Sequence, residues 1–181
     1  MIKTVKSLAT VWLGGCSGCH MSFLDLDEWL IDLASQIELV YSPLVDIKEY
    51  PHNVDIVLVE GAIANAEHLK TIHIIRERSH ILVSFGDCAV TGNVTALRNP
   101  LGSAESVLQH FYIEMADTHG QIPQASVPPL LDKVVPVHTV VPVDVYLPGC
   151  PPSATRIKSV LEVLLQGKTP VLEGREMIKF G

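Results

Sequence analysis

The chain has 181 residues, of which 48% are hydrophobic and 18% are charged, and its net charge is −7. This length suits one domain, and the apolar content leaves surface to spare, which in a soluble chain often indicates a permanent partner. The negative charge argues against nucleic acid or anionic lipid as a target, and no apolar run reaches the ~20 residues that cross a bilayer.

The first fifteen residues, MIKTVKSLATVWLGG, are basic and then apolar, so a signal peptide has to be considered. No small-residue cleavage site or twin-arginine pair follows, and cleavage near Gly15 would disrupt the cysteine pair that comes next. We therefore expect a cytoplasmic protein whose first strand covers residues 8–13.

Apolar runs alternate with helical patterns along the rest of the chain. Strands are expected at residues 8–13, 37–42, 54–61, 80–86 and 143–148. Apolar residues at helical spacing predict helices at 26–37, 65–79, 104–115 and 157–167. Short apolar strands alternating with helices are typical of a parallel sheet covered on both faces. The predicted fold is α/β, a flavodoxin-like doubly wound parallel sheet in a single domain over residues 1–181.

Two segments fall outside this alternation. Residues 117–142 contain prolines at 123, 128, 129, 136 and 142, while Val, Leu and Ile stay frequent. We expect an ordered but irregular Pro-rich excursion there. Residues 168–181 are expected to form a short C-terminal tail.

All four cysteines follow expected strands. Cys16 and Cys19 follow the first strand, Cys88 follows the fourth, and Cys150 follows the fifth. The carboxyl ends of parallel strands share one edge of a sheet, where α/β folds place their sites. We therefore expect the four thiols to converge at that edge.

Glycines flank these cysteines. Gly15 and Gly18 lie on either side of Cys16, and Gly149 precedes Cys150. Glycine lets the backbone turn tightly and approach a bulky group, and backbone N–H groups can then donate hydrogen bonds to sulfur. We expect these three glycines to contribute backbone around a bound cofactor.

Several interpretations of the four cysteines compete. Disulfides are disfavoured in the expected compartment. Structural zinc usually takes two close pairs, and this chain has one pair and two single cysteines. One [4Fe–4S] cluster, with all four cysteines as ligands, suits a cradle of loops and is the favoured interpretation. Four unrelated core cysteines, and a flavin suggested only by the fold, stay open.

Three polar residues lie near these cysteines in the sequence. Glu60 ends a strand at the same edge. In one interpretation its carboxylate lies near the cluster or a subunit interface and takes part in proton transfer. In the other it is a hydrogen-bonded loop acid. His20 is expected to hydrogen-bond a cluster sulfide or help move protons, without being a ligand. Asp87 is expected to cap a turn or meet a partner.

Four motifs carry a family resemblance in chain order: GCSGCHMSFL (15–24), VEGAI (59–63), SFGDCAVTGNV (84–94) and LPGCPPSA (147–154). Together they resemble the small subunit of [NiFe] hydrogenases, most of all the short, cytoplasmic, NAD-reducing (bidirectional) type. The resemblance covers nearly the whole chain.

This resemblance implies roles for the chain and its partners. Cys16, Cys19, Cys88 and Cys150 would ligate the [4Fe–4S] cluster proximal to a Ni–Fe site, which lies in a separate large subunit. The chain would relay electrons from that site to a diaphorase or ferredoxin-like iron–sulfur subunit, with NAD and flavin bound on other subunits. Hydrogen chemistry would take place on the partner, so no catalytic residue is expected here.

The chain departs from two related groups. It has neither the twin-arginine signal nor the C-terminal extension, with two more clusters, of longer respiratory small subunits, so one cluster is expected. Two residues separate Cys16 from Cys19, whereas the related subunit of NADH:quinone oxidoreductases has adjacent cysteines. Small subunits of coenzyme F420- or viologen-reducing hydrogenases remain alternatives, as does, from a different class, a four-cysteine zinc-stabilised interaction module.

Overall fold

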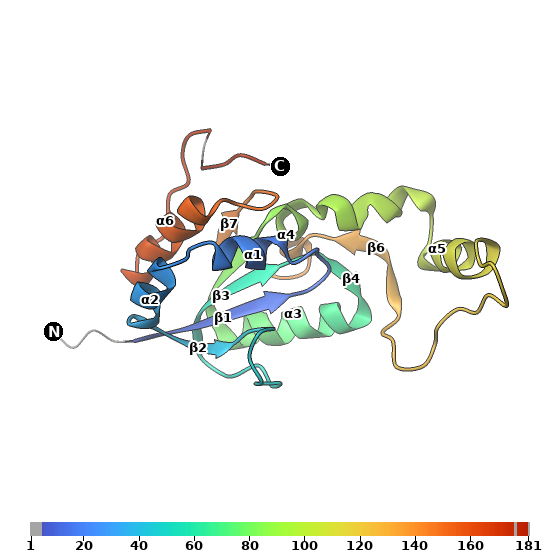
Figure 1. Cartoon of the computed structure of the whole chain (residues 1–181), viewed down its shortest axis with the longest axis horizontal. Helices are drawn as coiled ribbons and strands as arrows, with labels where there is room; N and C mark the ends of the chain where they lie inside the picture. Colours follow the sequence, from blue (N-terminus) through green and yellow to red (C-terminus); the bar gives the residue numbers. More distant parts are fainter. Residues whose placement is uncertain (1–4, 176, 181) are drawn as a thin grey trace.

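A computed structural model of the chain describes residues 5–175 and 177–180, and a parallel sheet lies at its centre (Figure 1). The strand order is β2-β1-β3-β5-β7, and every neighbouring pair is parallel. This confirms the predicted α/β doubly wound sheet, and the order is that of flavodoxin-like folds. The strands are β1 (Lys6–Trp12), β2 (Ile37–Tyr41), β3 (Val54–Glu60), β5 (Ser79–Phe85) and β7 (Val145–Leu147).

Helices cover both faces of this sheet (Figure 1). Successive strand residues point to opposite faces, so Leu8 and Leu58 belong to one hydrophobic cluster, and Ala9 and Val57 to the other. The first cluster packs under three helices, and Ile72 of a fourth helix closes the second. The helices are α1 (Gly18–Leu24), α2 (Trp29–Ala34) and α6 (Ala154–Leu165) on one face and α3 (Ala66–Arg78) on the other.

The helix expected at 26–37 is shorter than its apolar spacing predicts. It begins only at Trp29, and the turn before it contains Leu26 and Asp27, whose φ of +48° is left-handed. Leu26 and Leu33 are nevertheless buried in the same cluster. A turn and a helix can thus share one apolar face, which is why spacing alone overestimated the helix.

The other helix predictions hold with small changes. The helix expected at 65–79 is α3, and the Asn65 side chain caps it by accepting from His68 N. The helix expected at 104–115 is α5 (Ala104–Gln109) followed by a π-helical turn, η2 (His110–Glu114).

The Pro-rich segment 117–142 is more regular than predicted. β6 (Leu130–Val135) pairs antiparallel with β4 (Ile63–Asn65), and a 3₁₀ helix, η3 (Val137–Thr139), follows. Pro129 and Pro136 flank β6, where a missing N–H removes no ladder hydrogen bond. The expectation of an irregular excursion was therefore wrong for the part after residue 129, while residues 117–129 contain no helix or strand.

Two further elements connect the sheet to β6. They are α4 (Asp87–Thr91) and the 3₁₀ helix η1 (Asn93–Leu101). Asn99 of η1 donates to Val134 O at 2.8 Å and accepts from Val134 N at 2.7 Å. The Asn99 side chain therefore makes the pair of backbone hydrogen bonds that a neighbouring strand would otherwise make with β6.

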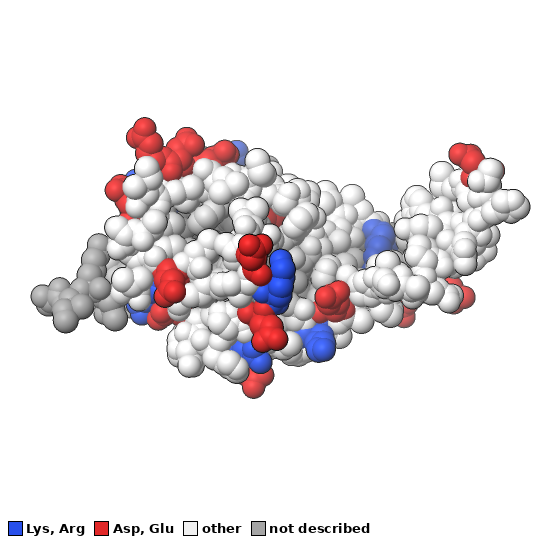
Figure 2. All heavy atoms as spheres, turned by 60° about the horizontal axis from the view of Figure 1, so that its bottom comes forward, with Lys and Arg blue, Asp and Glu red and all other residues white. Residues whose placement is uncertain are grey.

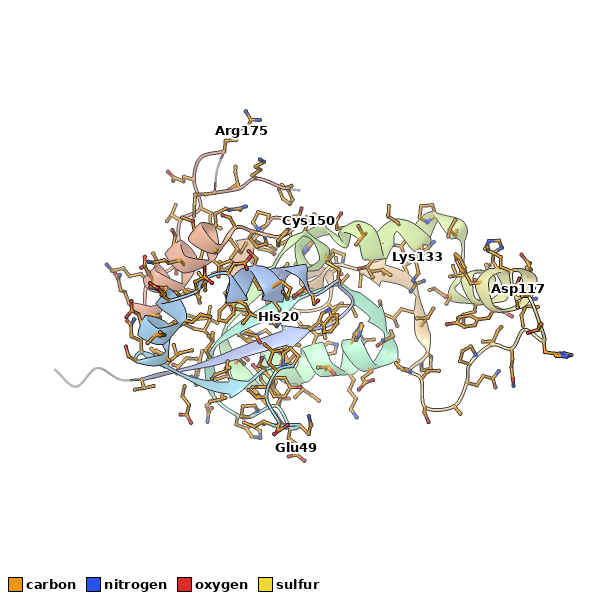
Figure 3. The ribbon with its side chains drawn as sticks, viewed as in Figure 1. His20, Glu49, Asp117, Lys133, Cys150 and Arg175 are labelled. Atoms are coloured by element: carbon orange, nitrogen blue, oxygen red, sulfur yellow. The ribbon has the colours of Figure 1, made fainter. Side chains whose placement is uncertain are left out.

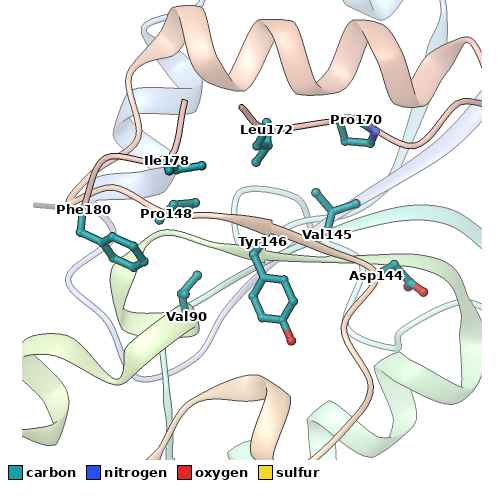
Figure 4. Close-up of a pocket in the computed structure, with 9 residues that line it drawn as sticks. All are labelled: Val90, Asp144, Val145, Tyr146, Pro148, Pro170, Leu172, Ile178 and Phe180. Atoms are coloured by element: carbon teal, nitrogen blue, oxygen red, sulfur yellow. The ribbon is translucent and has the colours of Figure 1, made fainter. Parts of the chain in front are cut away.

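The C-terminal tail lies against β7, an edge strand of the sheet. Figure 4 shows a largely apolar pocket between Val145 and Tyr146 of β7 and Leu172 and Phe180 of the tail. No cysteine lines this pocket. The tail therefore shields an edge that would otherwise expose apolar side chains.

Surface charge is mixed on the face seen in Figure 2. Acidic and basic side chains lie interspersed over its centre, without the basic stripe of a nucleic-acid-binding surface. Among the described residues, no helix combines the length and the apolar character that crossing a membrane requires.

The contact between Asn99 and Val134 generates a prediction. Asn99→Ala leaves two backbone groups of the buried Val134 without these partners, so we expect a local loss of about 1–3 kcal/mol. Hydrogen exchange of the 130–135 amides should accelerate. Gln109→Ala, at an exposed amide of α5, is the control. Equal exchange in the two variants would contradict the assigned role.

Candidate functional site

Four strand ends form a row at the carboxyl edge of the sheet. Trp12, Glu60, Phe85 and Leu147 are neighbours in register on β1, β3, β5 and β7. Three of these strands lead into segments that carry a cysteine, while the central β3 ends on Glu60. The parallel register therefore brings the cysteine segments to one edge.

The cysteines differ in their surroundings. Cys19 lies in α1 and Cys88 in α4, and both are buried. Cys16 and Cys150 lie in the loops after β1 and β7, and both are exposed. None of the four forms a disulfide. The site thus has an inner pair of thiols and an outer pair (Figure 3, where Cys150 is labelled).

The four thiols are close enough to affect each other's ionisation. Burial raises the pKa of the Cys19 thiol far above its usual range, and negative charge on Glu60 and on the other three cysteines raises it further. Burial also raises the pKa of Cys88, a hydrogen bond with Thr95 opposes this, and charge on two other cysteines adds to it. Thiols that disfavour one another's negative charge form a donor set suited to a cationic centre.

The three glycines named from the sequence make close contacts at this edge. A Cβ on Gly18 would lie 3.3 Å from Cys16 Sγ, and a Cβ on Gly15 would lie 3.2 Å from Gly61 Cα. Gly149 has a φ of +139°, and a Cβ there would lie 2.5 Å from the Pro152 backbone. Gly18 and Gly149 therefore let the cysteine loops turn tightly, and Gly15 lets the first of them lie close to the segment after β3.

Gly86, two residues before Cys88, faces a sulfur of another cysteine segment. It has a φ of +82°, and a Cβ there would lie 2.1 Å from Cys19 Sγ. Its position two residues before Cys88 gave no sign that it faces the sulfur of a different loop. This contact forms only because β1, β3 and β5 lie next to each other in the sheet.

Polar groups at the start of η1 reach the thiols, and the sequence did not single them out. The Asn93 amide donates to Cys150 Sγ at 3.3 Å. Hydrogen bonds with the Thr95 hydroxyl and the Val94 backbone N–H lower the pKa of Cys88, against the larger effect of burial. Such hydrogen bonds tune a thiolate ligand. The only sequence signal was their place just after the third cysteine.

Glu60 and His20 form a buried pair beneath the first cysteine segment. Glu60 is 1% exposed and accepts from Cys19 N at 3.4 Å and from His20 N at 2.9 Å. His20 Nδ1 lies 2.5 Å from Glu60 Oε2, and Figure 3 shows His20 in the interior below α1. Its buried Nε2 has no hydrogen-bond partner among the described residues. The structure thus joins two residues that the sequence analysis treated separately, and it ties α1 to the central strand.

The described residues contain no ready-made site for a single ion. Among residues 5–175 and 177–180, no three His, Cys, Asp or Glu side chains form a group that could hold one metal ion. A four-cysteine zinc site needs all its ligands around one ion, whereas a [4Fe–4S] cluster takes one thiolate on each of four irons. The two groups therefore require different separations of the four thiols.

Comparison with known proteins gives matches over most of the chain. Residues 16–164 match the family model described as NADH ubiquinone oxidoreductase, 20 Kd subunit. The NAD-reducing hydrogenase HoxS subunit delta of Cupriavidus necator is 38% identical, and the match covers 89% of this chain and 79% of that protein. A chain in a crystal structure of an NAD⁺-reducing [NiFe]-hydrogenase in the H₂-reduced state superposes with a TM-score of 0.92. It is 36% identical, and the match covers 98% of this chain and 100% of that one.

A longer relative also matches. It is a subunit of the F420-non-reducing hydrogenase vhu of Methanocaldococcus jannaschii, and it is 38% identical over 95% of this chain. The match spans only 60% of that protein's own length.

Gly86 generates the prediction for this site. In Gly86→Ala the new methyl group meets Cys19 Sγ, so we expect iron bound per chain, after anaerobic reconstitution, to fall about tenfold or more. Gly167→Ala is the matched control, because its φ is +72° but nothing lies within 4 Å of a Cβ there. Both variants carry ~1–2 kcal/mol of left-handed strain. Full iron content in Gly86→Ala would contradict the close packing of this edge around Cys19.

Proposed function

The chain belongs to the family of the 20 kDa subunit of NADH:ubiquinone oxidoreductase and groups there with the small subunits of [NiFe] hydrogenases, and from this premise we propose its function. We propose that it carries one [4Fe–4S] cluster, held by Cys16, Cys19, Cys88 and Cys150. In this proposal the chain relays electrons between the Ni–Fe site of a large subunit and a diaphorase module that reduces NAD. A cytoplasmic location belongs to the same proposal, since NAD is a cytoplasmic coenzyme.

The observation that carries this proposal is the convergence of the four cysteine segments at one sheet edge. The strands before them end in register, and the segment before Cys88 packs against Cys19 Sγ at Gly86. When bound, the cluster would supply a site that accepts and gives up one electron at a time. The backbone and side chains around it then have two tasks, which are to hold the thiolates and to limit water.

The chain's own residues are suited to these tasks. Phe85, Leu147 and Ala89 are buried beneath or beside the cysteines and keep water from the inner pair. Glu60 holds the segment of Cys19 and His20, and Asn93 holds Cys150. The proton-transfer role expected for Glu60, and a hydrogen bond from His20 to a cluster sulfide, stay predictions within this proposal.

Two candidate hydrogenase functions differ in the electron acceptor that the complex reduces. The Cupriavidus necator relative is named for NAD reduction, and the Methanocaldococcus jannaschii relative for a hydrogenase that does not reduce F420. The similarity to the NAD-reducing enzyme's chain, which is matched over its full length, favours NAD. Hydrogen-dependent reduction of NAD, F420 and viologen dyes by the purified complex would separate them.

Apolar side chains on the segments that flank the cysteines support a large-subunit partner. Leu97 is 71% exposed and lies on η1, whose first residue donates to Cys150. Other exposed apolar residues on these segments are Trp12, Met21, Val94 and Leu101. A permanent partner would cover this surface and place its own redox site near the exposed outer cysteines.

Replacing one ligand tests the cluster. In Cys88→Ala, one of four thiolates is lost, so we expect the complex to lose the cluster and hydrogen-dependent NAD reduction. The parent chain by itself, reconstituted anaerobically, should contain about four irons and four acid-labile sulfides. Ser153→Ala, at an exposed position after Cys150, is the control. One zinc and no sulfide in the parent would refute the cluster and support the zinc-stabilised interaction module.

A second substitution tests the partner surface. In Leu97→Asp, a charge replaces an exposed apolar side chain beside the cysteines, so we expect recovery of co-purifying large subunit to fall about tenfold or more, ~1.4 kcal/mol. Ile31→Asp on α2, where the parent residue is 76% exposed, is the matched control and should leave recovery unchanged. Equal effects of the two variants would place the interface elsewhere.

A further inference from the structure

Asp87 joins two of the cysteine segments. It directly precedes Cys88, is 5% exposed, and its Oδ1 accepts from Gly149 N at 2.5 Å. In the opposite direction, Asp87 N donates to Gly149 O at 2.9 Å. Two reciprocal hydrogen bonds therefore link the residue before Cys88 to the residue before Cys150. The sequence predicted a turn cap or a partner contact for Asp87, and the structure shows in addition a hydrogen bond to the segment of Cys150.

These bonds extend the sheet beyond its last ladder pair. Phe85 and Leu147 are the final partners of β5 and β7, and Gly86 N then donates to Leu147 O at 2.8 Å. At the next step Asp87 N still donates to Gly149 O, but in the other direction a side-chain oxygen of Asp87 accepts from Gly149 N in place of a backbone carbonyl. Gly149 is buried, so its N–H needs such an acceptor.

We propose that Asp87 is a positioning residue for the cluster, locking the Cys88 and Cys150 segments into one unit and so setting two of the four ligand positions. The inference rests on the proposed function, because it takes these two cysteines as ligands. An acceptor-bearing side chain is required at residue 87, and glycine is required at 149, where φ is +139°.

Glu60 and Asp87 hold different cysteine segments at this edge, which supports a positioning role for Asp87. Glu60 ties the segment of Cys19 to the central strand, and Asp87 ties the other two cysteine segments to each other. Cys88 and Cys150 come from strands β5 and β7, separated by about sixty residues of chain, so local sequence cannot hold them together. Residues that orient ligands in this way typically change metal affinity about 10–100-fold when removed.

Two variants of Asp87 separate a hydrogen-bonding role from a role of charge. Asp87→Ala removes the acceptor, and we expect iron and sulfide bound per chain, after anaerobic reconstitution of the full-length chain, to fall about tenfold. Asp87→Asn removes the charge but keeps a side-chain oxygen that can accept from Gly149 N, so we expect it to restore loading. The EPR spectrum of the reduced cluster should match the parent in Asp87→Asn and be altered in whatever cluster Asp87→Ala retains.

Asp55→Ala is the matched control. Asp55 also bridges neighbouring strands, accepting from Ser7 N at 2.9 Å and from Lys6 Nζ at 2.9 Å, but at the amino edge of the same sheet. We expect it to lower the free energy of unfolding without changing loading or the EPR spectrum.

The outcomes distinguish this inference from the proposed function. A parent chain that binds no iron on anaerobic reconstitution would refute the proposed function and this inference with it. A fully loaded parent together with a fully loaded Asp87→Ala variant of unchanged EPR spectrum would refute the positioning role alone. If Asp87→Ala does not fold, Asp87→Asn decides, because loss of the cluster in that variant would overturn a role based on the hydrogen bond.

Discussion

The parallel register of the central sheet is the constraint on which the site depends. It places Trp12, Glu60, Phe85 and Leu147 in one row, so the segments that follow β1, β5 and β7 begin side by side. A single-residue slip of one strand would move its cysteine by about 3.3 Å and reverse which side chains face the core. The buried apolar residues on both faces of β3 oppose such a slip. Core packing therefore fixes the positions of cysteines that belong to distant parts of the chain.

The site also concentrates groups that carry negative charge. Four thiols and Glu60 meet near the end of the sheet, and burial adds to the cost of ionising Cys19. Such a group is unfavourable by itself and becomes favourable when a cationic centre is shared among the thiolates. The hydrogen bonds to the Glu60 carboxylate offset part of its burial in the same way. In the proposed function, folding and cluster binding would therefore be coupled through electrostatics.

An appendage built from residues far apart in sequence extends from the doubly wound sheet. α5 and η2 project beyond the sheet, with Asp117 at their far end (Figure 3). The segment stays attached because β6 pairs with β4 and because Asn99 and Arg98 bind backbone atoms of β6. η1 therefore does two things, since its first residues contact the cysteines and its last residues hold the appendage. Through η1, the cysteine site is therefore linked to the part of the molecule that projects beyond the sheet.

The sequence by itself determined the five strands of the central sheet and the edge at which each cysteine lies. Continuous apolar runs identify buried strands, and Cys16, Cys19, Cys88 and Cys150 each follow one, so parallel geometry alone predicts their common edge. The sequence did not reveal β6 for two reasons. The prolines that flank it indicated irregular structure, and the strand is formed by pairing with β4. It did not reveal the contacts of Gly86 with Cys19, of Asn93 with Cys150, or of Asp87 with Gly149. Local patterns report the burial and the backbone preference of each residue, whereas these contacts join residues 57 to 67 positions apart, and only the tertiary structure brings them together.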